Sequence, residues 1–531
     1  MSFFDLVREQ KPFDQSAFYS YLRERSRVPP SLVDSSFLTK EHVLSSRSFC
    51  EKIDLIWGFQ KIDAPIMEAL FGLAQERKVF EQMEALLAGE KVNTLFGFSS
   101  ENRAALHAAL RDQFNKQCLT VAYAKDESRK ELEKLESFFS HNDRYTHLVF
   151  IGIGGSQLGP QALIEALKPY YKENKEVHFV SNVDPDEMTL LFKDLPCEKT
   201  LVAVVSKSGT TIETETNEAR ACAYFEQQGL SFPDHCISIT QPKSPMDDRT
   251  KYKEVFYVYD YVGGRYSSTS CVGGVLISFL CGYSIFSEIL KGASEMDHSL
   301  LEKDIAKNPA LTLALIGIWN RNFLNLPTLA IIPYSQGLNR FVAHLQQCDM
   351  ELNGKSILRT GENGFLKTAP IIWGEPGTNA QHSFFQLLHQ GTDIVPVDFI
   401  AFKKSQCVSD FVYKGTSSQE KLLANVLAQI VALALGKKDT NPNKCFLGDR
   451  PSSLILVDQL TPETLGMLLA LYENKIVFQG FFWGINSFDQ EGVQLGKILA
   501  GKFLKGIEAY RKNERVDLSP VEGSLLRTVF K

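Results

Sequence analysis

Four hydroxyl side chains and one ammonium group stand together in the run Ser206-Lys207-Ser208-Gly209-Thr210-Thr211. The run follows the apolar residues 201–205 and precedes a helical pattern that begins at Ile212. A phosphate group requires several short, directional hydrogen-bond donors and some positive charge, and this run offers both. Capping of the following helix by Thr210 or Thr211 explains one hydroxyl but not four. The run therefore favours a phosphate-binding loop.

A second candidate loop, residues 152–160, contains Gly152, Gly154, Gly155 and Ser156 and lies between a strand pattern and a helix pattern. Glycines let a backbone approach a ligand closely, and the amides at a helix N-terminus attract anions. A dinucleotide-binding loop fits poorly, because Gln157 stands where the third glycine of Gly-x-Gly-x-x-Gly is required. No Gly-Lys-Ser/Thr of a P-loop follows either. A glycine-rich turn is also common without a ligand, so this loop alone leaves both uses open.

Residues suited to proton transfer occur further along the chain. Gln347 and Glu351 are four residues apart in a helical pattern over residues 340–352, which ends at Asn353-Gly354, so they are expected to share one helix face. His382 follows a turn-rich run and opens a helix, where a neutral imidazole suits acid–base chemistry. Gln490 and Lys497 are expected to share one face of a helix near the C-terminus. Taken singly, each of these patterns is also typical of a solvated or structural side chain.

Alternating strands and helices must position these side chains. Apolar strand patterns lie at 147–153, 177–181, 201–205, 236–240 and 255–261, and the same alternation returns with strands at 329–332, 394–402 and 454–457. Continuous Val/Ile/Leu runs with helices between them predict parallel sheets covered on both faces. We therefore expect an α/β fold with two doubly wound parallel-sheet domains. Their predicted ranges are 121–288 and 289–510, with a helical N-terminal segment at 1–120 that packs on the second domain and a C-terminal tail at 511–531.

Several helices are expected outside the strand patterns. Residues 65–89 and 101–115 have helical periodicity, with Ser100 as the cap of the second segment. Thr461-Pro462 is a strong helix start, because proline at the first helical position costs no hydrogen bond. The uncharged stretch 266–287 is long enough to cross a bilayer, but its serines and glycines favour a buried core helix.

Composition excludes several classes of function. The 531 residues carry a net charge of −6, with no basic block of the kind that nucleic-acid binding requires. The ten cysteines form no CxxC pair and mostly lie in apolar runs, which is typical of reduced cysteines. The N-terminus lacks the apolar core of a signal peptide. We therefore expect a cytoplasmic protein with no membrane or nucleic-acid partner, and no cluster with metal-ligand spacing stands beside the candidate residues.

Seven stretches, in this order, resemble the glucose-6-phosphate isomerase family: 101–111, 152–160, 206–214, 263–267, 346–356, 373–391 and 479–497. The resemblance implies two sugar-isomerase (SIS-type) domains and a homodimer whose active sites lie at the subunit interface. It also implies isomerisation of glucose 6-phosphate and fructose 6-phosphate through ring opening and an enediolate, in glycolysis and gluconeogenesis, with no cofactor and no metal.

The resemblance assigns roles position by position. Glu351 is expected to move the proton between C2 and C1, and Arg265 to stabilise the enediolate. His382, reaching in from the partner subunit, and Lys497 are expected to assist ring opening. The expected substrate-binding residues are Gly155, Ser156, Ser206, Lys207, Ser208, Thr210, Thr211, Gln347 and Gln490.

Two rival functions remain in view. A non-catalytic sugar-phosphate sensor needs the hydroxyl loop but not Glu351, His382 and Lys497 together. A dehydrogenase needs the dinucleotide loop that residues 152–160 fit poorly.

Overall fold

The computed structural model describes residues 2–115, 118–407, 409–515 and 517–530. The chain divides into two compact units, Met1–Ser487 and Phe488–Lys531. The larger unit contains the two large β-sheets described below, and the smaller one is helical. The domain boundaries at 120, 288 and 510 stay predictions.

The first sheet is parallel throughout, and in the described residues it has five strands in the order β4-β3-β5-β6-β7. The strands are β3 (His147–Ile151), β4 (Glu176–Val180), β5 (Thr200–Val205), β6 (Cys236–Thr240) and β7 (Glu254–Tyr257). The strand order reverses between β3 and β5, because β4 lies on one side of β3 and all later strands lie on the other. In open α/β sheets, ligands bind beyond the carboxyl ends of the strands at such a point.

Helices cover both faces of this sheet, as the continuous apolar strands predict. Helices α8 (Pro185–Lys193) and α9 (Ile212–Gln227) pack on one face through Met188, Phe192, Ala221 and Phe225. Helices α6 (Ala122–His141) and α11 (Cys271–Leu280) pack against the edge strands β7 and β4. Every residue of β5 is buried as a result. Short helices α7 (Leu158–Ala166) and α10 (Phe232–His235) complete this part of the chain.

The second sheet repeats this strand order. In the described residues it has the order β1-β2-β13-β10-β8-β9. The parallel strands are β8 (Thr328–Pro333), β9 (Ile371–Trp373), β10 (Val397–Lys404) and β13 (Ser452–Gln459). Read from β9 to β13 they follow the order of the first four strands of the other sheet. Helices α15 (Phe385–Gln390) and α16 (Ser418–Leu435) cover one face of it. A small hairpin, β11 (Val412–Tyr413) and β12 (Thr416–Ser417), precedes α16.

The N-terminal segment is not wholly helical, because a hairpin inside it joins the second sheet. Strands β1 (Arg47–Cys50) and β2 (Ile53–Ile56) are antiparallel, and β2 pairs with β13. Neither strand was predicted from the sequence, since each spans only four residues. The helices of this segment are α1 (Phe3–Arg8), α2 (Ala17–Arg25), α3 (Lys40–Ser45), α4 (Ala64–Glu76) and α5 (Val79–Leu87).

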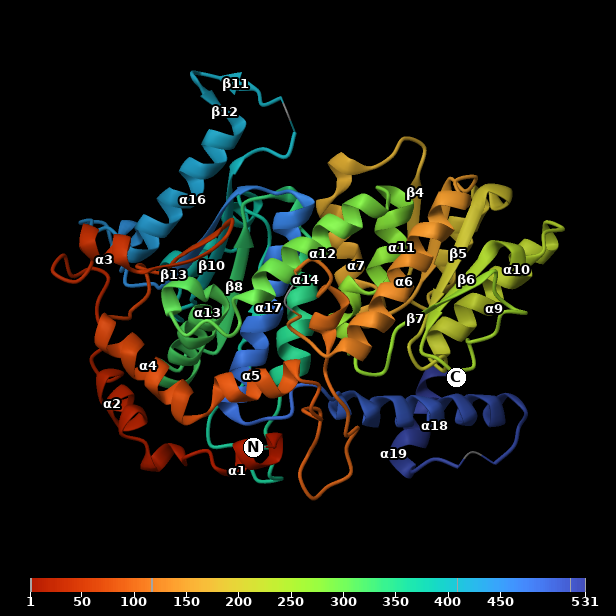
Figure 1. Cartoon of the computed structure of the whole chain (residues 1–531), viewed down its shortest axis with the longest axis horizontal. Coiled ribbons are helices and arrows are strands. Elements are labelled where there is room, and N and C mark those ends of the chain that lie inside the picture. The colour runs from red at the N-terminus through yellow and green to blue at the C-terminus, as the bar shows by residue number, and fades with distance from the viewer. Residues whose placement is uncertain (1, 116–117, 408, 516, 531) are drawn as a thin grey trace. The chain divides into compact units, whose positions relative to one another are not determined.

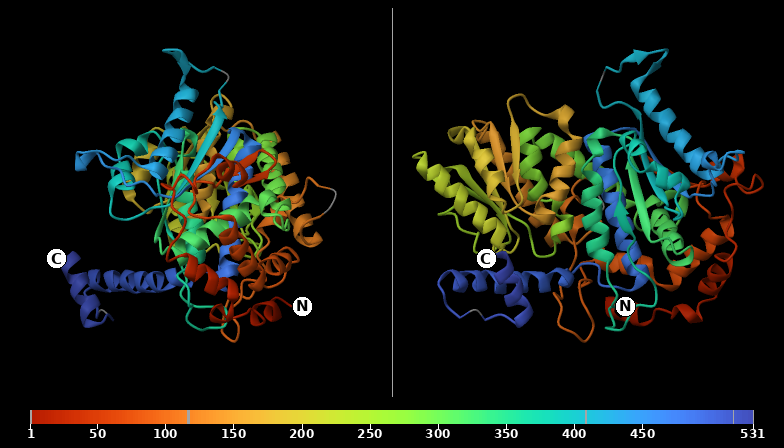
Figure 2. Two further views of the ribbon diagram at one scale, coloured as in Figure 1. Left: turned by 90° about the vertical axis from the view of Figure 1, so that its left-hand side faces the viewer. Right: turned by 180° about the vertical axis from the view of Figure 1, so that it is seen from behind.

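A group of helices lies between the two sheets (Figures 1 and 2). It consists of α12 (Tyr283–His298), α14 (Phe341–Gln346) and α17 (Pro462–Trp483). Helix α13 (Pro309–Ile318) packs along α17, as α12 does, and also contacts β1 and β2 of the second sheet. The predicted start of α17 is confirmed: the Thr461 hydroxyl accepts from the Thr464 amide at 3.2 Å, and Pro462 follows. α17 ends before Gly484, whose φ of +72° suits glycine.

Two helix predictions in the N-terminal segment need correction. The segment 65–89 is broken at Lys78, which has a left-handed backbone. The helix predicted over 101–115 is wrong: Arg103 pairs by backbone with Asn93, and only a 3₁₀ turn, His107–Leu110, forms there within the described residues. The Ser100 hydroxyl accepts from the Leu95 amide instead of capping a helix. Tertiary pairing overrides helix periodicity in this segment.

The stretch 266–287 forms buried structure but not one helix. It is divided into a 3₁₀ turn, α11 and the start of α12, with Gly282 at a φ of +97° between the two helices. Among the described residues, no helix combines the length and apolar character needed to cross a membrane.

The smaller unit consists mainly of two helices, α18 (Gln494–Arg511) and α19 (Pro520–Val529). They contact each other, with Lys502 Nζ 2.7 Å from a Glu522 carboxylate oxygen.

Candidate active site

The hydroxyl loop lies at the carboxyl end of β5, at the strand-order reversal. The Ser206 hydroxyl accepts from the Gly209 amide at 3.1 Å and lies 3.0 Å from the Thr211 hydroxyl. Thr211 occupies the position before α9, but its side chain makes no capping bond to that helix within the described residues. The structure therefore does not support the alternative in which the Thr211 hydroxyl only caps α9. The Thr210 hydroxyl bonds Ser208 Oγ at 3.1 Å, so the four hydroxyls form two linked pairs.

Lys207 connects this loop to the segment that precedes Arg265. Its ammonium donates to the backbone carbonyls of Asp260 and Val262 at 2.7 and 2.9 Å, and the Asp260 carboxylate lies 3.6 Å away. Burial lowers the pKa of Lys207 to about 8, with the Arg103 charge as a second cause. The side chain therefore places a positive charge beside the hydroxyl loop and also fixes the backbone that leads to Arg265.

The glycine-rich loop follows β3, on the neighbouring strand at the reversal. Gly155 is pressed against the backbone of Gly264: a Cβ on Gly155 would lie 2.3 Å from the Gly264 carbonyl carbon and 2.7 Å from the Arg265 nitrogen. Only glycine fits such an approach. The Ser267 hydroxyl donates to the Gly264 carbonyl at 2.7 Å and supports the same turn. Ser156 stands in the 3₁₀ turn that ends this loop.

Glu351 and Arg265 face each other beside these loops. Glu351 Oε2 lies 3.4 Å from Arg265 Nε; the arginine is buried, and the glutamate side chain is one-fifth exposed at 20%. The same glutamate oxygen is buried and makes no hydrogen bond within the described part of the chain. Buried polar atoms normally have partners, so this oxygen is suited to a ligand or a transferred proton.

The helix that carries Glu351 contains a π-helical turn, Gln347–Glu351, directly after α14. The sequence predicted a regular helix here, and the structure corrects it. The Gln347 amide nitrogen lies 3.4 Å from where a Cβ on Gly154 would stand, and Cys348 Sγ lies 3.6 Å from the Arg265 carbonyl oxygen. Single π turns are frequent at functional sites. This one directs Gln347 toward the glycine-rich loop and Glu351 toward the Arg265 guanidinium.

A buried ion pair holds this turn against α17. Lys475 Nζ lies 2.6 Å from an Asp349 carboxylate oxygen, and both side chains are 2% exposed. Neither Asp349 nor Lys475 was singled out from the sequence, although their ion pair supports the turn that carries Glu351. Their types are common in helices, and no local pattern relates two positions on different helices.

His382 ends a 3₁₀ turn, Asn379–His382, on the side of the second sheet. Its side chain is exposed. Among the described residues, no hydrogen bond or ion pair joins its imidazole to Glu351 or Gln347. The structure therefore does not bring His382 into this group within one chain, and its role stays a prediction.

Gln490 and Lys497 belong to the smaller unit. Lys497 is exposed on α18, whereas Gln490 precedes the 3₁₀ turn Glu491–Val493 that comes before this helix. The prediction that both share one helix face is therefore wrong, because Gln490 is outside the helix. Their roles toward substrate stay predictions.

A group that could hold a metal ion occurs elsewhere in the described residues. His147, Glu176 and His178 place one ligand atom each within 4.8 Å of one another. His147 and Glu176 are the first residues of β3 and β4, and His178 is the third residue of β4, whereas the glycine-rich loop follows the last residue of β3.

Comparisons with known proteins agree with this geometry. Residues 57–522 match the model of the family described as phosphoglucose isomerase. The chain is 49% identical over 507 residues to a glucose-6-phosphate isomerase of Chlamydia caviae, covering 95% of this chain and 96% of that one. It is 50% identical over 504 residues to the corresponding Chlamydia pneumoniae protein, covering 94% and 96%.

A solved structure gives the same result. The crystal structure of a glucose-6-phosphate isomerase from Chlamydia trachomatis superposes with a TM-score of 0.93 at 44% identity, covering 98% of this chain and 99% of that one. Together with the parallel strands of the first sheet and β8, β9, β10 and β13 of the second, this confirms the predicted α/β fold class. A family match over most of the sequence and relatives near 50% identity leave one assignment: the chain belongs to the phosphoglucose isomerase family.

Proposed function

We propose that this chain interconverts glucose 6-phosphate and fructose 6-phosphate through ring opening and a cis-enediolate, in glycolysis and gluconeogenesis. One observation carries the proposal: Glu351 Oε2 lies 3.4 Å from Arg265 Nε beside two loops that suit a phosphate. The family's curated relatives carry the name of this activity. The site supplies a proton carrier, a fixed cation and an anion cradle at one point of the fold.

The chemistry assigns each group a step. The Glu351 carboxylate removes the proton from C2 of the open aldose and then delivers a proton to C1. The glutamate therefore ends the reaction in the charge state in which it began. Charge that develops on the enediolate oxygens is stabilised by the Arg265 guanidinium, which burial holds in place before reaction. The hydroxyls of Ser206, Ser208 and Thr211 bind the phosphate, with Gly155, Ser156, Lys207 and Thr210 around it.

His382 and Lys497 assist opening of the sugar ring, and Gln347 and Gln490 contact the substrate. Because His382 stands apart from Glu351 within one chain, its proposed source is the partner subunit of a homodimer. Exposed apolar side chains support such a dimer: Phe411, Val412 and Tyr413 on the β11–β12 hairpin are 72%, 63% and 56% exposed. Apolar patches of this kind mark protein–protein contacts. We place the enzyme in the cytoplasm, where its phosphorylated substrates are used.

A shared site is tested by mixing two inactive variants. Glu351→Gln and His382→Ala homodimers are each expected to be inactive. After joint unfolding and refolding, half of the dimers are mixed and each mixed dimer holds one intact site, so about a quarter of wild-type activity returns. A site contained within one chain gives no recovery.

The activity itself is tested by incubating the purified protein with fructose 6-phosphate in D₂O and following the product by ¹H NMR. Glucose 6-phosphate labelled with deuterium at C2 is expected, because the proton carrier exchanges with solvent. A sugar-phosphate sensor binds the substrate without forming product, and that result would refute the proposed reaction.

A further inference from the structure

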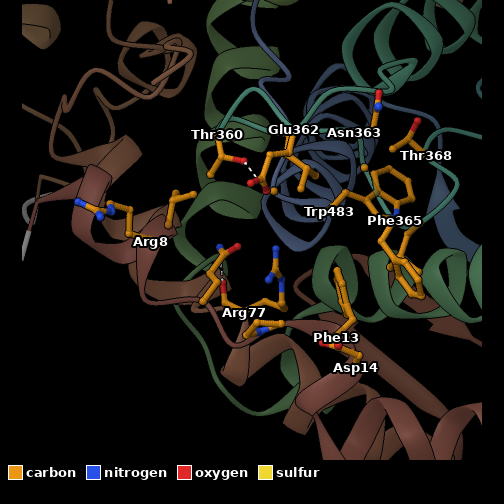
Figure 3. A pocket seen from close by; sticks show the side chains of 17 residues that line it. Arg8, Phe13, Asp14, Arg77, Thr360, Glu362, Asn363, Phe365, Thr368 and Trp483 are labelled. Carbon is orange, nitrogen blue, oxygen red and sulfur yellow. Dashed lines mark hydrogen bonds between the residues drawn. The ribbon is translucent and has the colours of Figure 1, made fainter. Parts of the chain in front are cut away.

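A cavity of about 520 Å³ lies in the larger unit, and none of the proposed active-site residues lines it. Its walls come from residues 7–14, Arg77, residues 358–368, and Trp483 with Gly484. Figure 3 shows Arg77 and Phe13 on one side of the cavity, and Thr360, Glu362 and Trp483 on the other. Small-molecule sites typically have volumes of roughly 300–1,000 Å³, so this cavity has the size of a binding site.

Arg77 is a buried cation, only 6% exposed, at this cavity. Its Nε donates to the Phe482 carbonyl at 3.0 Å and its Nη1 to the Lys11 carbonyl at 3.3 Å, and the Phe13 ring lies 4.5 Å from the guanidinium carbon. Among the described residues Nη2 donates to no acceptor and no carboxylate forms an ion pair with Arg77; Nη2 is open to the cavity rather than sealed in the core. Burial lowers the pKa of Arg77 to about 10, so the group is charged at neutral pH.

A buried charge without a counter-ion is unfavourable, and a cavity beside it has room for the missing anion. The position of Nη2 agrees with this, because it lies 2.8 Å from where a Cβ on Gly484 would stand, at the cavity wall. Glycine at 484 therefore leaves the guanidinium its space.

The remaining walls define the chemistry of the ligand. Apolar surface comes from Phe13, Leu358, Phe365, Leu366 and Trp483. The carboxylates of Asp14 and Glu362 also line the cavity, and Glu362 accepts from the Thr360 hydroxyl at 3.4 Å. The wall holds two cations, the buried Arg77 and the exposed Arg8, and two carboxylates, so it has no excess of positive charge for a multiply charged phosphate ester. A single negative charge on an apolar body matches the cavity.

We propose that this cavity is a binding site for a small organic monocarboxylate with an apolar body, whose carboxylate pairs with Arg77. The carboxylate accepts from Nη2, which gives the buried guanidinium its missing charge-assisted hydrogen bond. The apolar body of the ligand packs against Trp483 and Phe365, and water is displaced from these rings.

The probe for this site is 4-phenylbutyrate, measured by isothermal titration calorimetry on the full chain. We expect one molecule bound per chain with a Kd of about 0.1–1 mM, the range suited to a ligand of this size. Arg77→Gln and the neutral analogue 4-phenylbutan-1-ol are each expected to weaken binding by about tenfold or more, because a charged hydrogen bond is lost.

Three control variants locate the site and guard against misfolding. Arg450→Gln removes another buried arginine, one that donates to the Gly391 and Asp393 carbonyls, and should leave probe binding unchanged. Leu366→Trp should fill the cavity and abolish binding while Arg77 stays in place. Lys207→Ala should leave probe binding unchanged, because Lys207 does not line this cavity and contacts the segment before Arg265 instead.

The proposal is overturned if wild-type protein binds no probe at 10 mM, about tenfold above the expected range. Equal affinity for the acid and the alcohol, or unchanged binding in Leu366→Trp, also refutes it. Weaker binding in Lys207→Ala than in Leu366→Trp places the probe in the isomerase site and overturns it as well.

Discussion

Glu351→Gln is the sharpest perturbation of the proposed mechanism. Glutamine keeps the shape of the side chain and can still lie beside the Arg265 guanidinium, 3.4 Å from the present carboxylate oxygen. It cannot accept a proton. General-base contributions are typically about 10²–10⁴-fold, so kcat should fall by at least about 10²-fold, which equals about 2.7 kcal/mol of barrier.

Folding and substrate binding should survive this change. Glutamine keeps a side-chain oxygen that can accept from the buried Arg265 guanidinium, so the change removes the charge of Glu351 without removing the acceptor beside the arginine. The proposed phosphate site is the separate loop after β5, so KM should change by no more than about threefold. Opening of the ring, assigned to His382 and Lys497, should continue.

The assay measures two reactions on one sample by NMR: exchange of the C2 proton with deuterium, and interconversion of the sugar anomers. We expect C2 exchange to be lost in Glu351→Gln while anomer exchange stays near wild type. The matched control is Glu213→Gln, because Glu213 lies in the first turn of α9 beside the hydroxyl loop. Near-normal C2 exchange in Glu351→Gln, with loss in Glu213→Gln, would move the role of base to Glu213.

Three further predictions follow from the structure. Activity should survive exhaustive EDTA treatment, since Arg265 is the proposed charge stabiliser; loss on chelation with recovery by a divalent ion contradicts this. Lys207→Ala should raise KM while kcat stays within about threefold of the wild-type value. The KM of the wild-type protein should rise above pH about 8, where Lys207 loses its charge, and Lys207→Ala should lack this rise. Arg111→Met should lower stability by about 3–5 kcal/mol, because it leaves the buried Asp297 and Glu473 unpaired. Thermal unfolding of Arg111→Met is compared with that of Lys403→Met, which removes the exposed ion pair of Lys403 and Asp458. Equal unfolding midpoints for the two variants would refute the predicted loss of stability.

The sequence by itself determined the elements whose signals are local. Continuous apolar runs located the parallel strands of the first sheet, because both faces of such a sheet are covered. Thr461-Pro462 located the start of α17, because the cap and the proline act on the same turn. The run from Ser206 to Thr211 was found in the same way, since its four hydroxyls and one ammonium lie within six residues.

Tertiary structure decided which distant groups meet. The pairing of Arg265 with Glu351, the contact of Gly155 with Gly264 and the ion pair of Asp349 with Lys475 join segments that no local pattern relates. In the segment 101–115 a local pattern gave the wrong prediction. Its periodicity is that of a helix, but the backbone of Arg103 pairs with Asn93 instead. Periodicity reports the preference of a few neighbouring residues, whereas packing and burial of charge depend on the whole fold. The types of the catalytic candidates could therefore be predicted, but the π turn that directs Glu351 toward Arg265 could not.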